Sequence, residues 1–196
     1  FAGSQWQEMT RQPVVFFAFR NVKADSAGAL LQALKDPVRA EYERYYTLFG
    51  DERLPEFQRK EFQMAYESLH AGSERKDSES YVIRSIMILC QTLNLYYGKK
   101  VYLLLDEYDT PFMSANSGEY YEEVRSILNG ILSTSLKGNP FLEKAVLTGI
   151  QRIAKENIFS ANNCFAQAQA LELTFQKRKL LSVNPTLPQK CILRQK

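Results

Sequence analysis

The sequence has little of what a metal-centred or disulfide-stabilised protein needs. Its 196 residues include three cysteines, far apart, and a single histidine. None of these has the short spacing of a zinc site or a disulfide framework. Cys90 lies in an apolar run, where a free cysteine usually serves as a small buried side chain. These features favour a reducing, cytoplasmic location.

Long apolar runs and a dominant charge are also lacking. No stretch approaches the ~20 apolar residues of a membrane span, and no segment resembles a signal peptide. Lys and Arg number 25 against 22 Asp and Glu, a net charge of +3, which is too balanced to indicate nucleic-acid binding by itself. Hydrophobic residues make up 45% of the chain. That content suffices for a packed core, and the length suits one domain.

Short apolar runs alternate with segments of helical periodicity. Runs rich in β-branched and aromatic residues predict buried strands, at Val14–Phe19, Val101–Leu105 and Ala145–Thr148. Apolar residues at helical spacing predict helices at Ala24–Leu34, Tyr81–Tyr97 and Glu119–Leu136. Gly98 and Lys137-Gly138-Asn139 follow the last two helices as expected terminators. Strands that alternate with helices predict a mainly parallel α/β sheet covered on both faces.

The segment 36–80 differs from this pattern. It is rich in charged and aromatic residues and is interrupted by Gly50-Asp51 and Pro55. We expect short amphipathic helices that form an insertion or lid packed on the core. A nucleic-acid-binding face is the alternative, but the basic residues alternate with glutamates and do not cluster.

Three carboxylates follow the strand at Val101–Leu105. In parallel sheets, chemistry takes place beyond the carboxyl ends of the strands, where this sequence places Asp106, Glu107 and Asp109. A first carboxylate there can hold Mg²⁺ through its water shell, and a second can polarise a water for attack on a phosphoryl group. The structural alternative is that one of them caps the next helix. Asp109 is placed to cap the turn at Pro111.

Several blocks of the sequence, in order, resemble the AAA-ATPase-like family. The blocks are Tyr97-Gly-Lys-Lys-Val-Tyr-Leu-Leu-Leu-Asp-Glu-Tyr-Asp-Thr-Pro111, Tyr120-Tyr121, Ile131-Leu-Ser-Thr-Ser-Leu-Lys137 and Ala145-Val-Leu-Thr-Gly-Ile-Gln-Arg-Ile-Ala-Lys-Glu-Asn-Ile-Phe-Ser160. The resemblance extends from about Pro13 to Asn163. Members often carry a PD-(D/E)XK nuclease-like domain after the ATPase-like one, so such a domain is an expected partner in the full-length protein.

The resemblance implies a partial P-loop NTPase-type three-layer sandwich that binds ATP and Mg²⁺. The strand at Val101–Leu105 would be the Walker B strand, with Asp106 at the metal and Glu107 as the catalytic base. Thr148 would be a polar sensor near the γ-phosphate. Arg152 or Lys155 could approach the phosphates or a neighbouring subunit, and a solvated surface role is the alternative for both. The resemblance leaves nucleic-acid binding and oligomerisation open.

Two departures from the family pattern shape the expected function. No G-x-x-x-x-G-K-[ST] loop occurs in the chain, although phosphate binding in such domains needs one. The chain begins with Phe1 and not with Met, which is typical of a fragment or a processed chain. The resemblance implies that the loop lies upstream of this region, so we expect a fragment that is active as an ATPase only in the full-length protein. The strand that carries this loop would flank Ala145–Thr148, so that edge is expected to be open. The alternative is a degenerate P-loop module with a regulatory or protein-interaction role and no hydrolysis.

The second departure is at the carboxyl end of the chain. The family pattern stops after Asn162-Asn163, and residues 164–196 have no clear core pattern. We therefore divide the chain into an ATPase-like domain at 1–163 and a weakly ordered tail at 164–196. A nuclease role for this segment is disfavoured, because its carboxylates lack the lysine that such a site places beside them.

Overall fold

The computed structural model describes residues 12–23, 25–70, 78–115 and 120–149, together with the backbone of two later strands at 171–172 and 179–183. The elements, in chain order, are β1 (Val14–Ala18), α2 (Ala27–Arg44), the 3₁₀ helix η1 (Tyr46–Gly50), α3 (Glu56–Ser68), α4 (Ser78–Tyr97), β2 (Val101–Asp106), α5 (Thr110–Ala115), α6 (Tyr121–Leu136), β3 (Leu142–Gly149), β4 (Leu171–Glu172) and β5 (Lys179–Val183).

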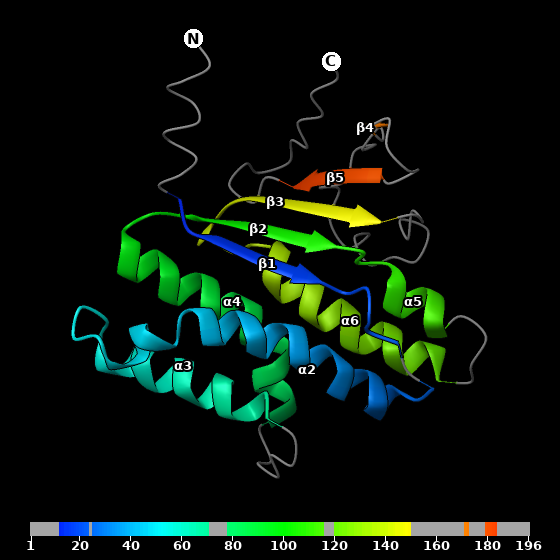
Figure 1. Cartoon of the computed structure of the whole chain (residues 1–196), viewed down its shortest axis with the longest axis horizontal. Coiled ribbons are helices and arrows are strands. Elements are labelled where there is room, and N and C mark those ends of the chain that lie inside the picture. Colours follow the sequence, from blue (N-terminus) through cyan, green and yellow to red (C-terminus); the bar gives the residue numbers. More distant parts are fainter. Residues whose placement is uncertain are drawn as a thin grey trace.

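The strands form one sheet in the order β1-β2-β3-β5-β4 (Figure 1). β1, β2 and β3 are parallel, and Phe17 pairs with Leu105, which pairs with Leu147. The predicted α/β fold with parallel crossovers is therefore confirmed. β5 pairs antiparallel with β3 along 145–149. The expectation of an open edge at Ala145–Thr148 is thus wrong, because backbone groups from the tail pair with this edge. The division of the chain at residue 163 stays a prediction.

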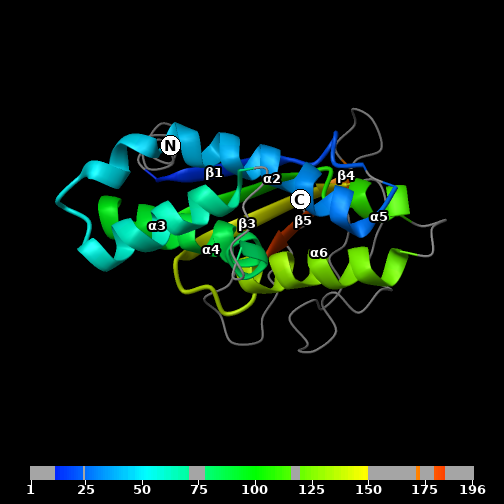
Figure 2. The same ribbon diagram turned by 90° about the horizontal axis from the view of Figure 1, so that it is seen from below.

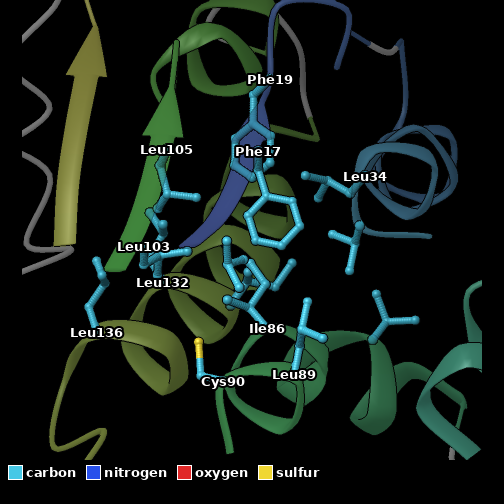
Figure 3. Packing of buried hydrophobic residues seen from close by; sticks show 14 of the residues in the cluster. Phe17, Phe19, Leu34, Ile86, Leu89, Cys90, Leu103, Leu105, Leu132 and Leu136 are labelled. Atoms are coloured by element: carbon cyan, nitrogen blue, oxygen red, sulfur yellow. The ribbon is translucent and has the colours of Figure 1, made fainter. Parts of the chain in front are cut away.

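The helices α2, α3, α4 and α6 lie on the same side of the sheet (Figures 1 and 2). Strand residues alternate between the two faces, and in β2 those at 101, 103 and 105 are buried while their neighbours are partly exposed. Figure 3 shows Phe17, Leu103 and Leu105 directed toward Ile86 and Leu89 of α4. Within the described residues, the core thus lies between the sheet and one helical layer.

The predicted insertion at 36–80 consists of regular elements. It holds the second half of α2, then η1 and α3, and ends at the start of α4. The sequence prediction ended the first helix at Leu34, but α2 continues through Pro37 to Arg44. Pro37 removes one helical hydrogen bond. The helix continues because Val38 and Tyr42 are buried on the same face as Leu34.

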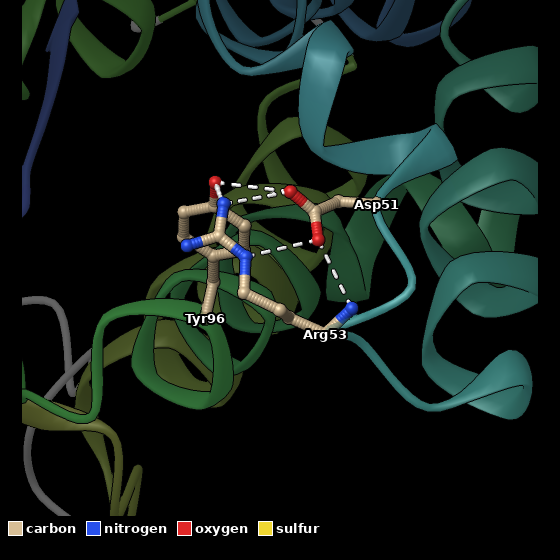
Figure 4. A network of polar contacts seen from close by, with 3 residues as sticks. All are labelled: Asp51, Arg53 and Tyr96. Carbon is tan, nitrogen blue, oxygen red and sulfur yellow. Dashed lines mark hydrogen bonds and ion pairs between the residues drawn. The ribbon is translucent and has the colours of Figure 1, made fainter.

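The loop between η1 and α3 is attached to α4 by a small polar network (Figure 4). The Arg53 guanidinium forms an ion pair with Asp51 at 2.7 Å and lies 4.0 Å from the centre of the Tyr96 ring. The Tyr96 hydroxyl lies 3.1 Å from an Asp51 carboxylate oxygen. A cation over an aromatic ring stabilises such a contact by about 0.5–1 kcal/mol at an exposed site. The network therefore positions the insertion against the end of α4.

The outer edge of β1 is covered by side chains of α2 and the residue after it. Phe16 donates its backbone N–H to Glu41 Oε1 at 3.1 Å, and the Tyr45 hydroxyl donates to the Val14 carbonyl at 2.8 Å. Glu41 is only 4% exposed, and Arg44 lies 2.7 Å from its carboxylate. These bonds satisfy backbone groups that an edge strand would otherwise present to other chains.

Cys90 occupies the core as the sequence predicted. It is buried on α4, and burial raises the pKa of its thiol to about 12. A thiol that stays protonated at neutral pH is a poor nucleophile. Cys90 therefore serves as a core side chain.

Candidate functional site

The carboxyl ends of β1, β2 and β3 meet at one edge of the sheet, and Asp106 ends the middle strand. The Asp106 carbonyl accepts the Phe19 N–H at 2.9 Å, so its backbone is held by β1. The Thr148 hydroxyl, from β3, donates to Asp106 Oδ1. The structure thus brings together the predicted metal residue and the predicted sensor residue.

Glu107 has a left-handed backbone conformation. Its φ is 54°, the one positive value at a non-glycine residue in the part of the chain that the structure describes. Such a conformation costs about 1–3 kcal/mol at a residue with a side chain, and it persists only where the surroundings enforce it. It turns the chain sharply after Asp106.

Backbone hydrogen bonds hold this turn. Glu107 N–H lies 3.4 Å from Thr148 Oγ1, and Tyr108 N–H donates to the Thr148 carbonyl at 3.1 Å. Thr110 N–H donates to the Glu107 carbonyl at 3.0 Å. The Thr148 hydroxyl therefore contacts both predicted carboxylate residues, because it donates to the Asp106 carboxylate and accepts the Glu107 N–H.

Arg20 approaches Glu107 from β1. Its Nε lies 3.3 Å from Glu107 Oε1, and the two side chains are 64% and 18% exposed. Arg20 was not among the site residues predicted from the sequence. The available signal was its position two residues after a parallel strand, at the same edge as Asp106.

Tyr108 and Asp109 pack against the end of β3. Both are 1% exposed. A Cβ atom built on Gly149 would lie 2.6 Å from Asp109 Oδ1 and 2.9 Å from Tyr108 Cε1. Only glycine fits this close approach. Gly149 was not among the site residues predicted from the sequence.

Asp109 immediately precedes α5, a six-residue helix that the sequence analysis did not predict. The Asp109 carbonyl accepts the Met113 N–H at 3.0 Å. A pocket of about 360 Å³ opens beside this helix, lined by Lys23, Glu107, Asp109, Thr110, Met113 and Ser114. Glu107 is thus accessible from the pocket, whereas Asp106 does not line it.

The model of the AAA-ATPase-like family, described as predicted AAA-ATPase, matches residues 2–159. The chain belongs to this family. Searches of curated proteins and of solved structures find no match. As an AAA-ATPase-like chain it carries an ATPase-like domain, and the match includes all of β1, β2 and β3. No helix of its described residues is long and apolar enough to cross a membrane.

The oxygen donors at this edge of the AAA-ATPase-like domain suit Mg²⁺ if waters and substrate phosphates complete its ligands. The described residues contain no group of three or more His, Cys, Asp or Glu side chains that could hold a metal ion. Mg²⁺ usually keeps several waters and takes one or two protein carboxylates plus substrate phosphates. Asp106 and the hydroxyl of Thr148 offer oxygen ligands of that kind. The other predicted phosphate-binding residues, Arg152 and Lys155, lie outside the described residues.

Proposed function

We propose that this chain supplies the metal and water-activating half of an ATP-hydrolysing site. The observation that carries the proposal is the placement of Asp106 and Glu107 at the end of the middle parallel strand, with Thr148 of β3 bonded to both residues. Residues that end such a strand face the crevice in which open α/β sheets bind ligands.

Asp106 would hold Mg²⁺, directly or through its waters. When bound, Mg²⁺ neutralises charge that develops on the transferred phosphoryl group. Asp106 suits this role because its backbone is fixed by Phe19 and its side chain by Thr148. The carboxylate is thus oriented before any ligand arrives, which is how a site stabilises charge without reorganising during the reaction.

Glu107 would accept a proton from the attacking water. The two carboxylates have different surroundings, because Glu107 lies 3.3 Å from Arg20 Nε and lines the pocket beside α5, whereas Asp106 accepts the Thr148 hydroxyl. Thr148 would contact the γ-phosphate end of the nucleotide, and Arg152 would add positive charge there. The phosphate cradle itself would come from a G-x-x-x-x-G-K-[ST] loop outside this chain, in a full-length protein that also carries a nuclease-like domain.

A second candidate function is a regulatory or protein-interaction module that does not hydrolyse ATP. One observation favours it. β5 pairs with β3 along 145–149, the edge at which the strand bearing a phosphate-binding loop is expected. A chain that keeps this antiparallel strand in the full-length protein would leave no room for that loop beside Thr148.

Turnover by the full-length protein separates the two candidates. We expect Mg²⁺-dependent ATP hydrolysis that Glu107→Gln reduces by roughly 10²–10⁴-fold with ATP binding intact, because a catalytic base contributes about that factor. Asp106→Ala should instead weaken binding of the Mg²⁺–ATP complex. The matched control is Glu122→Gln, on the exposed first turn of α6. Equal turnover by the Glu107→Gln and unmodified proteins would remove the catalytic assignment.

A further inference from the structure

We propose that Gly149 is a positioning residue for Glu107, acting through the packed turn at 107–109. The inference rests on the proposed function of Glu107 and adds a residue to it. Gly149 ends β3 and is buried. It touches neither nucleotide nor water in this proposal. It lets the turn after β2 lie directly against the end of β3.

The contacts leave no space for a side chain at position 149. A Cβ there would lie 2.6 Å from Asp109 Oδ1, 2.8 Å from Asp109 Cγ and 2.9 Å from Tyr108 Cε1. Contacts this short force a neighbour to move. Asp109 and Tyr108 are both 1% exposed, so either one can move only by disturbing the residues packed around it, and overpacking of this kind shifts side chains and backbone.

The displacement reaches Glu107 because the turn is one short connected unit. Asp109 and Tyr108 follow Glu107 directly, and Tyr108 N–H and Glu107 N–H both lie against Thr148, the neighbour of Gly149. The end of β3 holds the turn at 107–109 through Thr148. A methyl group on the next residue, Gly149, would displace this turn. The left-handed backbone of Glu107 depends on those bonds.

The backbone of Asp106 is held from the opposite side, by β1. It lies within β2, where it pairs with Ala18, and its carbonyl accepts the Phe19 N–H from β1. Asp106, the proposed metal ligand, should thus keep its position while Glu107, the proposed base, moves. This difference predicts a loss in kcat with little change in KM.

The test compares Gly149→Ala with Gly28→Ala in the full-length protein. Gly28→Ala, on α2, adds the same methyl group at a position where no other atom lies within 4 Å. We expect Gly149→Ala to lower kcat by at least ~10-fold, because small misplacements of reacting groups cost up to about 10²-fold. KM for ATP should change by less than ~3-fold, the pattern of a lost transition-state interaction. Gly28→Ala should change neither.

Two further measurements keep the outcomes distinct. Hydrogen–deuterium exchange at the Tyr108 amide should be faster in Gly149→Ala and unchanged in Gly28→Ala, whether or not the protein turns over ATP. Ile86→Val, which trims the core on α4, should lower thermal stability without the kcat loss. If Gly149→Ala alone does not fold, Gly149→Ala with Asp109→Ala should give more folded protein than the single variant, because the clashing carboxyl atoms are gone.

The two hypotheses fail in different ways. No ATP turnover in the unmodified full-length protein would overturn the proposed function. Turnover in that protein with unchanged kcat and unchanged Tyr108 exchange in Gly149→Ala would overturn the positioning role alone. A kcat loss of the same size in Ile86→Val would also overturn it, since the effect would then follow global stability.

Discussion

Arg20 Nε lies 3.3 Å from Glu107 Oε1 and joins the exit of β1 to the exit of β2. The arginine side chain is 64% exposed, so water and salt screen much of the attraction. Exposed ion pairs of this kind contribute about 0–1 kcal/mol. We expect Arg20→Ala to lower the free energy of unfolding by less than ~1 kcal/mol. Urea denaturation at low and high salt measures this.

The matched control for Arg20 is Arg84→Ala, which removes an ion pair with Glu61 at 2.8 Å away from the proposed site. Similar small losses in both variants are expected. A loss of several kcal/mol in Arg20→Ala alone would contradict the view that its pair with Glu107 is a weak surface contact.

Glu41→Ala should destabilise the fold more than its charge alone suggests. The change removes the acceptor of the Phe16 N–H at the outer edge of β1. An unsatisfied group in a partly buried place costs about 1–3 kcal/mol. Thermal unfolding measures the loss. Glu43→Ala, an exposed neighbour on the same helix, should change stability far less, and equal losses would exclude the edge-capping role.

Thr148→Val should impair the site while leaving β3 intact, because valine keeps the shape and the strand preference of threonine. It removes the hydroxyl that donates to Asp106. In the full-length protein we expect the affinity for Mg²⁺–ATP to fall by roughly tenfold, since a hydrogen bond to a charged group is worth about 1.5–3 kcal/mol. Unchanged affinity, measured by calorimetry, would show that Asp106 needs no orientation by Thr148.

Arg152→Ala should lower ATP turnover in the full-length protein, because an arginine near the γ-phosphate stabilises charge in the transition state. The competing explanation is a salt bridge with Glu156, four residues later. Glu156→Ala is therefore the control. A loss of turnover in Arg152→Ala but not in Glu156→Ala supports the phosphate role, and equal losses support the salt bridge.

Residues 1–196 alone should not hydrolyse ATP. The sequence contains no G-x-x-x-x-G-K-[ST] loop, and positioning of the phosphates supplies most of the catalysis in phosphoryl transfer. Asp106 and Glu107 would have no held phosphate to act on. Mg²⁺-dependent phosphate release from the purified chain is the measurement. Release above that of a Glu107→Gln chain would show that this segment already contains a complete site.

The sequence predicted the three parallel strands because their signals are local, whereas β4 and β5 were not predicted. The apolar run at Val101–Leu105 and the glycine at Gly98, whose φ is 63°, each define a structure within a few residues. Asp106 and Thr148 could be paired in advance because ends of parallel strands share an edge. Contacts that depend on tertiary packing were missed.

The missed contacts share one physical cause. The Arg20 side chain, after β1, reaches Glu107 at the end of the adjacent strand β2. The space at Gly149 is limited by Asp109, in the loop after β2. No periodicity encodes such contacts. The end of α2 was placed too early because Pro37 is a strong local stop signal, which the burial of Val38 and Tyr42 overrides.

The parallel pairing of β1 with β2 has a consequence for how the chain folds. Val15 pairs with Leu103. The connection between these two adjacent strands therefore contains α2, α3 and α4. Loop-closure entropy opposes such distant pairing until helices shorten the connection. We expect β2, α5, α6 and β3, which are consecutive elements of the chain, to form the folding nucleus, and β1 to join late. Substitutions in β1 should then speed unfolding and leave the folding rate nearly unchanged.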